Sequence, residues 1–246
     1  REYSNRGNTY VALGDYQKAL ADLQRAVRMK GDDARVLASY GYALLQTGDF
    51  SGSIAVYDQA IQRDPGRSEN FQNRGTARYS SGDLAGATND YSRAIELDPS
   101  NADAYFNRGL VRIGQGRLAD AIADFQTTLS LKPRHAMACS NLGVAYSRSG
   151  QMDLAMQSYD RALGINPDFL DVYLNRGIDY YTLKQYDQAL QDLEQAIELN
   201  PAIGASFYFR GLTLLGLGRE GACKDFQQAL RLGFNMAAEQ VSQHCK

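Results

Sequence analysis

The stretch Asn101–Pro133, NADAYFNRGLVRIGQGRLADAIADFQTTLSLKP, contains one complete copy of the structural unit from which this chain is built. It predicts two helices, over 102–115 and 118–131, because Gly116 interrupts the first run and Pro133 prevents the second from continuing. Apolar residues in the second run recur at three- and four-residue intervals, which places them on one face of a helix. The unit is therefore expected to be a pair of helices that pack against each other.

The same unit recurs every 34 residues along nearly all of the 246-residue chain. One glycine marks each copy, at Gly7, Gly41, Gly75, Gly109, Gly143, Gly177 and Gly211. In the first six copies a small residue follows this glycine by 12 positions and a large residue follows it by 16, so the two helices are expected to approach closely at the glycine. The regular spacing predicts an all-α chain of seven units over 1–234, starting near residues 1, 35, 69, 103, 137, 171 and 205.

This pattern resembles the tetratricopeptide repeat (TPR) family, whose unit is a helix–turn–helix of 34 residues. An aromatic or apolar residue stands four positions before each glycine, although the usual tryptophan is absent throughout. The resemblance covers about the whole chain and implies a right-handed TPR superhelical solenoid with a concave groove lined by the first helices. Residues 235–246 are expected to form a C-terminal capping helix with Asn235 at its N-cap, because the last unit of a solenoid must cover its neighbour and face water.

Arginine directly precedes the glycine in five repeats, and in four of these an aspartate follows the arginine by 16 residues. These pairs are Arg6–Asp22, Arg74–Asp90, Arg108–Asp124 and Arg176–Asp192. Where the arginine slot instead holds Tyr40 or Leu142, the aspartate slot holds Val56 or Ser158. Because the two residue types occur together, we interpret them as ion pairs between the two helices of one repeat, since a buried arginine needs an anionic partner. The alternative is that the arginines bind an acidic ligand.

The last repeat shows the same pair with a shifted spacing. Asp225 follows Arg210 by 15 residues rather than 16, and the turn between the two helices is one residue shorter than in the other repeats. With this one deletion the remaining residues of the repeat fall into their usual slots. We therefore expect a seventh unit with a tightened turn.

Composition excludes several classes of function. The chain has 26 Lys+Arg against 28 Asp+Glu and a net charge of −2, so it lacks the basic excess typical of nucleic-acid binding. No apolar run is long enough to span a bilayer, so no membrane insertion is expected. Neither His135 nor His244 has spaced ligands around it, and no glycine-rich phosphate loop is present. We therefore expect a protein that is not an enzyme and has no metal, no cofactor and no catalytic residues.

The resemblance implies that side chains two and three residues before the glycine, one after it, and four or five after it face the groove. The slot two before the glycine holds asparagine in five of seven repeats, and an amide can hold the C=O and N–H of a peptide together. Some family members are known for such an asparagine ladder. The candidate groove residues are Asn5, Asn73, Asn107, Asn141, Asn175, Phe106, Leu110, Ile178, Tyr181 and Tyr208. The alternative is that the asparagines support their own repeats and that about half of the apolar residues pack between first helices.

These features favour a scaffold that binds an extended peptide or an amphipathic helix of a partner protein in its groove. The slot three before the glycine contains no lysine, which argues against clamping of a chaperone's C-terminal carboxylate. Two alternatives remain open: a scaffold that self-associates through an uncapped N-terminal face, and the substrate-docking arm of a larger enzyme. The chain opens at Arg1 inside the repeat pattern, so we expect it to be a fragment whose missing N-terminus could have carried a targeting segment.

The three cysteines bear on the compartment. Cys139 stands at a packing slot and is expected to be a buried thiol. Cys223 and Cys245 lie on the last repeat helix and the capping helix, where adjacent helices could bring them within disulfide range. The residues around them resemble an ending found in some bacterial TPR proteins. Two free thiols are the default expectation; a bridge would instead indicate an extracytoplasmic rather than a cytoplasmic location.

Overall fold

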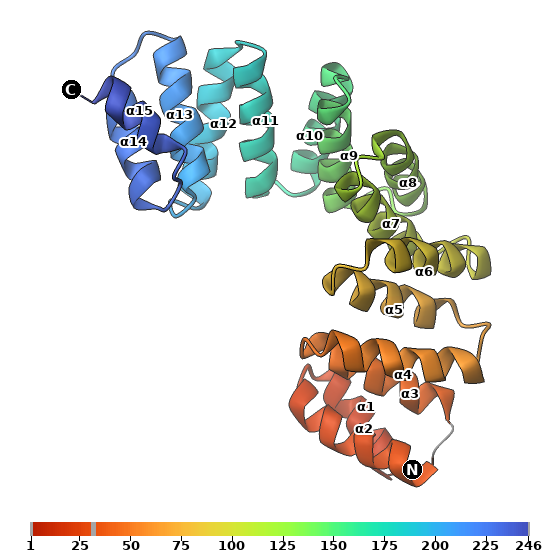
Figure 1. Cartoon of the computed structure of the whole chain (residues 1–246). Coiled ribbons are helices and arrows are strands. Elements are labelled where there is room, and N and C mark those ends of the chain that lie inside the picture. Colours follow the sequence, from red (N-terminus) through yellow and green to blue (C-terminus); the bar gives the residue numbers. More distant parts are fainter. Residues whose placement is uncertain (1, 31–32, 246) are drawn as a thin grey trace. The chain divides into compact units, whose positions relative to one another are not determined.

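The computed structural model describes residues 2–30 and 33–245, and within them all regular structure is α-helical. Helices follow one another as antiparallel pairs joined by short turns (Figure 1). Their bounds are α1 (Glu2–Ala12), α2 (Tyr16–Lys30), α3 (Ala34–Gln46), α4 (Phe50–Arg63), α5 (Ser68–Ser80), α6 (Leu84–Leu97), α7 (Ala102–Gly114), α8 (Leu118–Leu131), α9 (Ala136–Arg148), α10 (Met152–Ile165), α11 (Leu170–Thr182), α12 (Tyr186–Leu199), α13 (Gly204–Gly216), α14 (Ala222–Arg231) and α15 (Ala237–His244). The helices predicted over 102–115 and 118–131 are confirmed as α7 and α8, with α7 one residue shorter.

The helices form two compact units. Helices α1–α8 make up the first, and α9–α15 make up the second. Within each unit the second helix of one pair packs against the first helix of the next pair, so that the odd-numbered helices follow one another along one side.

Each pair is held by a close contact between the glycine and a large residue of the second helix, as the spacing predicts. At Gly109 of α7, a Cβ atom would lie 2.6 Å from the ring of Phe125 on α8, and at Gly143 of α9 it would lie 2.5 Å from the ring of Tyr159 on α10. Only glycine permits this approach, because any side chain would displace the buried ring. The turn that follows α7 uses Gly116 at φ +73°, a conformation that glycine adopts without strain.

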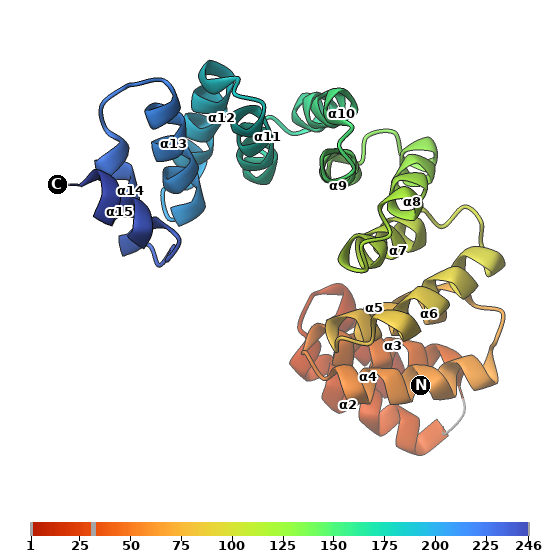
Figure 2. The same ribbon diagram turned by 45° about the horizontal axis from the view of Figure 1, so that its top comes forward.

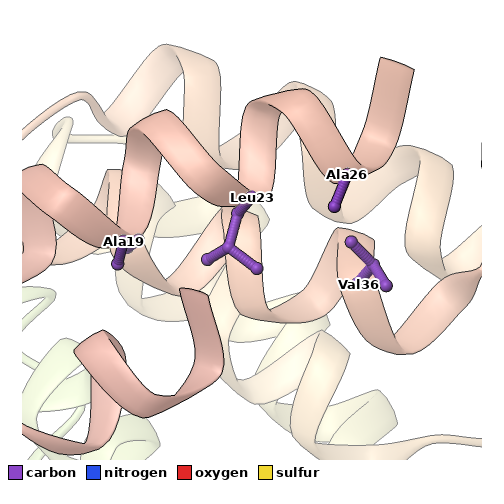
Figure 3. Packing of buried hydrophobic residues seen from close by; sticks show 5 residues of the cluster. Ala19, Leu23, Ala26 and Val36 are labelled. Atoms are coloured by element: carbon purple, nitrogen blue, oxygen red, sulfur yellow. The ribbon is translucent and has the colours of Figure 1, made fainter. Parts of the chain in front are cut away.

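Small and aliphatic residues fill the space between successive pairs. Figure 3 shows one such contact, in which Leu23 and Ala26 of α2 point towards neighbouring helices and Val36 of α3 points towards Ala26. Leu23 and the nearby Ala19 are completely buried. The core therefore runs as a series of clusters along the helix pairs rather than as one central core, which is the packing typical of a helical-repeat protein.

The predicted ion pairs are confirmed in five repeats. In each, the guanidinium Nε and Nη2 donate to the two carboxylate oxygens of the aspartate, giving Arg6–Asp22, Arg74–Asp90, Arg108–Asp124, Arg176–Asp192 and Arg210–Asp225. The five aspartates are buried, so each needs a cationic partner. Asp90 and Asp124 have a second one, since they also accept from Arg78 and Arg112. The pairs are part of the fold, as the structural interpretation requires.

The same arginines also reach the preceding helix pair. Arg74 pairs with Asp58 of α4, Arg108 donates to Ser92 of α6 at 3.0 Å, and Arg176 pairs with Asp160 of α10. Each of these partners lies 16 residues before its arginine. One arginine therefore links three helices and fixes the register between neighbouring pairs.

At the C-terminal end, α13 is followed by a short turn and α14, and one expectation is corrected. Helix α14 begins at Ala222 directly after Gly221, whose φ is +109°. The following helix, α15, begins at Ala237, and its N-cap position is Met236 without a side-chain hydrogen bond, so Asn235 is not the expected cap. Helices α14 and α15 lie side by side (Figure 2).

Two of the three cysteines are joined. Cys223 and Cys245 form a disulfide with a Cα–Cα distance of 5.2 Å, in place of the two free thiols taken as the default. The bridge connects α14 to the residue that follows α15. Cys139 is a free, buried cysteine as expected, and burial raises the pKa of its thiol.

Candidate functional site

A cavity of about 450 Å³ lies in the second unit, between the first helices α9 and α11 and the linker that joins α10 to α11. Its lining residues are Ala136, Met137, Ser140, Asn141, Val144, Asn166, Phe169, Asp171, Leu174 and Asn175. Five of these come from α9, two from the linker and three from α11. The volume falls within the range of small-ligand pockets in proteins.

Local sequence places the walls of this cavity. The ring of His135 caps α9, because its Nδ1 accepts a hydrogen bond from the backbone N–H of Ala138 at 3.1 Å. Helix α10 stops at Ile165 since Pro167 cannot continue it. The linker then returns the chain to the start of α11 and brings Phe169 to the cavity.

Two asparagine amides face the cavity from neighbouring first helices, and they differ in which hydrogen-bond donors and acceptors remain for a ligand. Asn141 Nδ2 donates to the backbone carbonyl of Met137 at 2.8 Å, so its Oδ1 remains as an acceptor. The Asn175 side chain makes no hydrogen bond within residues 2–30 and 33–245, which leaves both its donor and its acceptor for a ligand. Between them, the two amides can accept from and donate to a peptide backbone.

The rest of the lining is mainly apolar. Met137, Val144, Phe169 and Leu174 contribute hydrophobic surface, and Met137 is 52% exposed. Asp171, at the start of α11, is the one ionisable residue among the lining side chains, and it is exposed. An apolar lining with a few polar groups is typical of a binding site rather than of a reaction centre.

A buried carboxylate lies one helical turn beyond the cavity on α11. Asp179 is 8% exposed, and its Oδ1 accepts from Ser147 Oγ of α9 at 2.8 Å while its Oδ2 accepts from Tyr159 OH of α10 at 3.2 Å. Burial raises the pKa of Asp179, and its two hydroxyl partners offset part of this rise. Burial and the neighbouring Asp179 carboxylate also raise the pKa of Tyr159.

The structure divides the candidate groove residues of the second unit. Asn141 and Asn175 line the cavity, whereas Ile178 and Tyr181 lie further along α11 and are half-buried. The Tyr181 ring contacts the rings of Tyr186 and Phe209. Both residues are thus outside the cavity.

Two of the apolar candidate groove residues are buried in the core. Tyr208 is 8% exposed, and its ring packs against Phe226 and Phe234. Phe106 is 7% exposed and packs against Phe125 at 5.9 Å between ring centres. The slot three before the glycine points partly into the contact between helices, so a large ring there becomes part of the packing.

The remaining candidates belong to the first unit. Asn5 on α1 is exposed, Asn73 on α5 is half-buried, and Asn107 and Leu110 on α7 are half-buried. None of them lines the cavity of the second unit. They therefore remain candidates on sequence grounds alone.

Sequence reasoning missed five residues of the cavity, namely Ala136, Met137, Asn166, Phe169 and Asp171. Met137 and Asp171 lie four residues before Asn141 and Asn175, which is one helical turn earlier on the same face. This periodicity was available in the sequence as a signal. Asn166 and Phe169 lie in the linker, and nothing in the repeat pattern indicates which linker residues turn inward.

The described part of the chain holds no cluster of His, Cys, Asp and Glu residues that could bind a metal ion. None of its helices combines the length and apolar character needed to cross a membrane.

Comparison with protein families identifies the repeat. Models of the tetratricopeptide repeat match residues 4–68, 75–116, 102–135, 136–169 and 170–202. The chain belongs to the tetratricopeptide repeat family. Members of this family are generally non-enzymatic scaffolds, so the assignment supports a role in protein–protein interaction. No curated protein matches the chain.

Solved structures of TPR proteins share the fold. A TPR protein from Parabacteroides merdae matches with a TM-score of 0.74 at 21% identity, covering 98% of this chain and 96% of its own. MamA matches with a TM-score of 0.61 at 25% identity, covering 65% of this chain and 94% of its own. YrrB, described as a TPR protein with an unusual peptide-binding site, matches with a TM-score of 0.63 at 23% identity, covering 76% of this chain and 97% of its own. The all-α TPR solenoid class expected from the sequence is confirmed.

Proposed function

We propose that this TPR protein is a non-enzymatic scaffold that binds an extended peptide segment of a partner protein in the cavity between α9 and α11. One observation carries the proposal: two asparagine side chains, Asn141 and Asn175, lie on neighbouring first helices at the wall of one largely apolar cavity. An extended peptide presents alternating C=O and N–H groups, which an amide side chain can engage in pairs.

The hydrogen-bonding state of the two amides suggests how such a peptide is held. Asn175 would donate to a peptide carbonyl and accept from a peptide N–H, since its own side chain is not engaged within the described residues. Asn141 would accept from a second N–H through its Oδ1, because its Nδ2 is already bound to Met137. These contacts involve the peptide backbone and therefore require little of the peptide sequence.

The apolar lining would supply selectivity. Met137, Val144, Phe169 and Leu174 would receive one hydrophobic side chain of the peptide, and a methionine at the rim adapts its shape to different partners. The exposed Asp171 carboxylate would favour a peptide with Lys or Arg beside that hydrophobic residue. The peptide class expected is therefore extended, with an apolar anchor next to a basic residue.

Selection from a displayed library of random peptides tests this proposal. Enrichment of sequences with an apolar residue beside Lys or Arg is expected. The selected peptide is then titrated calorimetrically against the wild-type chain and against Asn175→Ala, which is expected to bind it roughly tenfold more weakly because two backbone hydrogen bonds are lost.

A matched control separates recognition from folding. Gln157 is an exposed residue on α10 outside the cavity lining, so Gln157→Ala is expected to leave peptide affinity unchanged. Asn175→Ala should unfold at nearly the wild-type temperature, since its amide makes no hydrogen bond within the described residues. Failure of the library to enrich any peptide, or equal affinity of Asn175→Ala and wild type, would overturn the proposal. A loss of stability as large as the loss of affinity would assign Asn175 to packing instead.

A further inference from the structure

Asp179 lies at a position where a carboxylate is unexpected. Its side chain is buried where α9, α10 and α11 meet, and its two hydrogen-bond donors, Ser147 and Tyr159, are both hydroxyls. The other buried aspartates of the repeats, such as Asp192, are instead paired with a guanidinium. A buried carboxylate held by neutral donors carries a desolvation cost that an ion pair would reduce.

The repeats themselves show that packing does not require this arrangement. Ser147 stands four residues after the glycine of its repeat, and Asp179 stands two residues after the glycine of the next. The same two slots in successive repeats hold Val11 and Ala43, Leu45 and Ala77, Tyr79 and Val111, Ile113 and Ala145, Ser147 and Asp179, and Tyr181 and Thr213. Only one combination pairs a hydroxyl with a carboxylate, and it lies beside the cavity. The two unusual residues occur together, as the arginines and aspartates do.

The geometry connects this pair to the cavity walls. Ser147 lies on α9 one turn after Val144, and Asp179 lies on α11 one turn after Asn175. The 2.8 Å hydrogen bond between them therefore joins the two helices directly beyond the end of the cavity. Tyr159 fixes the carboxylate from the side of α10, so the carboxylate cannot swing away without breaking a second bond.

We infer that Asp179 is a positioning residue for the peptide cavity: through Ser147 and Tyr159 it holds α9 and α11 at the separation at which Asn141 and Asn175 can engage one peptide. This inference rests on the proposed function. The carboxylate contacts no ligand itself, and its effect on binding is transmitted through the spacing of the two helices. The buried Asp179 carboxylate thus lowers the stability of the fold and at the same time sets the width of the cavity.

The decisive variant replaces the polar pair by an apolar combination found elsewhere in the chain. Ser147→Leu with Asp179→Ala reproduces the residues of the Leu45 and Ala77 slots. This double variant is expected to be about as stable as wild type, because the removal of a buried carboxylate offsets the loss of the partner of the buried Tyr159 hydroxyl. It is also expected to bind the library-selected peptide roughly tenfold more weakly, because a misplacement of about 1 Å is enough to disrupt a positioned contact.

A conservative variant and a matched control complete the design. Asp179→Asn keeps an acceptor for Ser147 and a polar partner for Tyr159. This single variant should therefore bind the selected peptide with nearly the wild-type affinity. Thr213 occupies the same slot in the next repeat, and its hydroxyl donates to Phe209 O of its own helix at 2.8 Å. Thr213→Ala is therefore expected to leave peptide affinity unchanged.

A readout without ligand separates this inference from the proposed function. The crystal structure of the double variant gives the distance between the Cα atoms of Asn141 and Asn175, which is expected to differ from that of wild type by about 1 Å. An unchanged distance would overturn the positioning role, whatever the affinity. A changed distance in a protein whose wild-type form binds no library peptide would support the positioning role and overturn the peptide-binding function. Loss of affinity in Asp179→Asn equal to that of the double variant would also count against the inference.

Discussion

Two helix pairs of this protein are held together in different ways. In α7–α8, Arg108 donates to both carboxylate oxygens of the buried Asp124, at 3.0 and 2.8 Å. In α9–α10 the corresponding residues are Leu142, which is buried, and Ser158, whose Oγ donates to Leu154 O of its own helix at 2.7 Å. Both pairs nevertheless have the same helix lengths and the same glycine–aromatic contact.

The difference shows that the ion pair is not what brings two helices of a repeat together. The glycine contact and the apolar face do this in both pairs. In α7 the arginine adds a link to the preceding pair through Ser92 of α6. Helix α9 is instead joined to α11 by the Ser147–Asp179 hydrogen bond, and it forms one wall of the cavity.

The largest effect is expected from breaking an ion pair while leaving the other charge buried. Arg176→Leu would leave Asp192, which is 4% exposed, without the guanidinium that supplies both of its hydrogen bonds. The free energy of unfolding should fall by about 3–5 kcal/mol. Urea denaturation of the two proteins measures this difference.

The matching double variant tests whether α11–α12 can be held together without an ion pair, as α9–α10 is. Arg176→Leu with Asp192→Ser reproduces Leu142 and Ser158, and it should recover most of the lost stability. A double variant no more stable than Arg176→Leu would show that the pair is not the source of the loss.

A smaller effect is expected for the same substitution in α7. Arg108→Leu leaves Asp124 with one remaining cation, because Arg112 Nη1 also contacts its Oδ2 at 2.5 Å. The unfolding free energy should therefore fall by only about 2–3 kcal/mol, the range typical of a hydrogen bond to a charged group. Equal losses for Arg108→Leu and Arg176→Leu in the same denaturation assay would show that Arg112 does not compensate.

The contact that both pairs share can be tested within one helix. Gly109→Ala would place a methyl group 2.6 Å from the Phe125 ring and should cost about 1–2 kcal/mol, because the buried ring must move. Gly114, on the same helix, has no atom within 4 Å of the corresponding position, so Gly114→Ala should be neutral or stabilising by up to about 1 kcal/mol. Thermal unfolding of both variants measures the contrast. Similar melting temperatures would mean that close helix approach is not what the glycine provides.

The repeat made much of this structure predictable. The helix pair over 102–131 could be predicted because glycine and proline punctuate it, and the Arg108–Asp124 pair could be predicted because seven copies of one unit can be compared within a single chain. The second contact of Asp124, to Arg112, follows the helical period, but the constant spacing of 16 residues between arginine and aspartate does not indicate it.

The cavity between α9 and α11 was less predictable than the fold, because its residues have two possible environments. Slots that face the groove in one repeat also face the neighbouring first helix, and side-chain size decides between the two. Thus Asn175 lines the cavity, whereas Phe106 is buried against Phe125. Phe169 reaches the cavity through the path of a linker, and this path depends on how two helix pairs pack rather than on local sequence. The pair Ser147 and Asp179 becomes visible only once α9 and α11 are adjacent.

The smallest effect concerns the buried carboxylate of α11 and depends on pH. Burial raises the pKa of Asp179 above its ordinary value of 3.8, so the folded protein binds a proton more readily than the unfolded chain does. At neutral pH the ionised carboxylate therefore lowers stability, and Asp179→Asn should be more stable than wild type by about 1 kcal/mol or less. As the pH falls through the raised pKa towards 3.8, wild-type Asp179 becomes protonated in the folded state and the advantage of the variant should disappear.

The stability contribution of Asp98 is expected to depend on pH in the opposite direction. Hydrogen bonds from the side chain and backbone of Ser100 lower the pKa of Asp98, so its ionised form stabilises the fold above the ordinary carboxyl pKa. Asp98→Asn should therefore lose stability at neutral pH, and this loss should vanish on acidification as Asp98 is protonated. Urea denaturation of both variants between neutral and acidic pH measures the two trends. Parallel curves for Asp179→Asn and wild type would mean that Asp179 is not a destabilising buried charge.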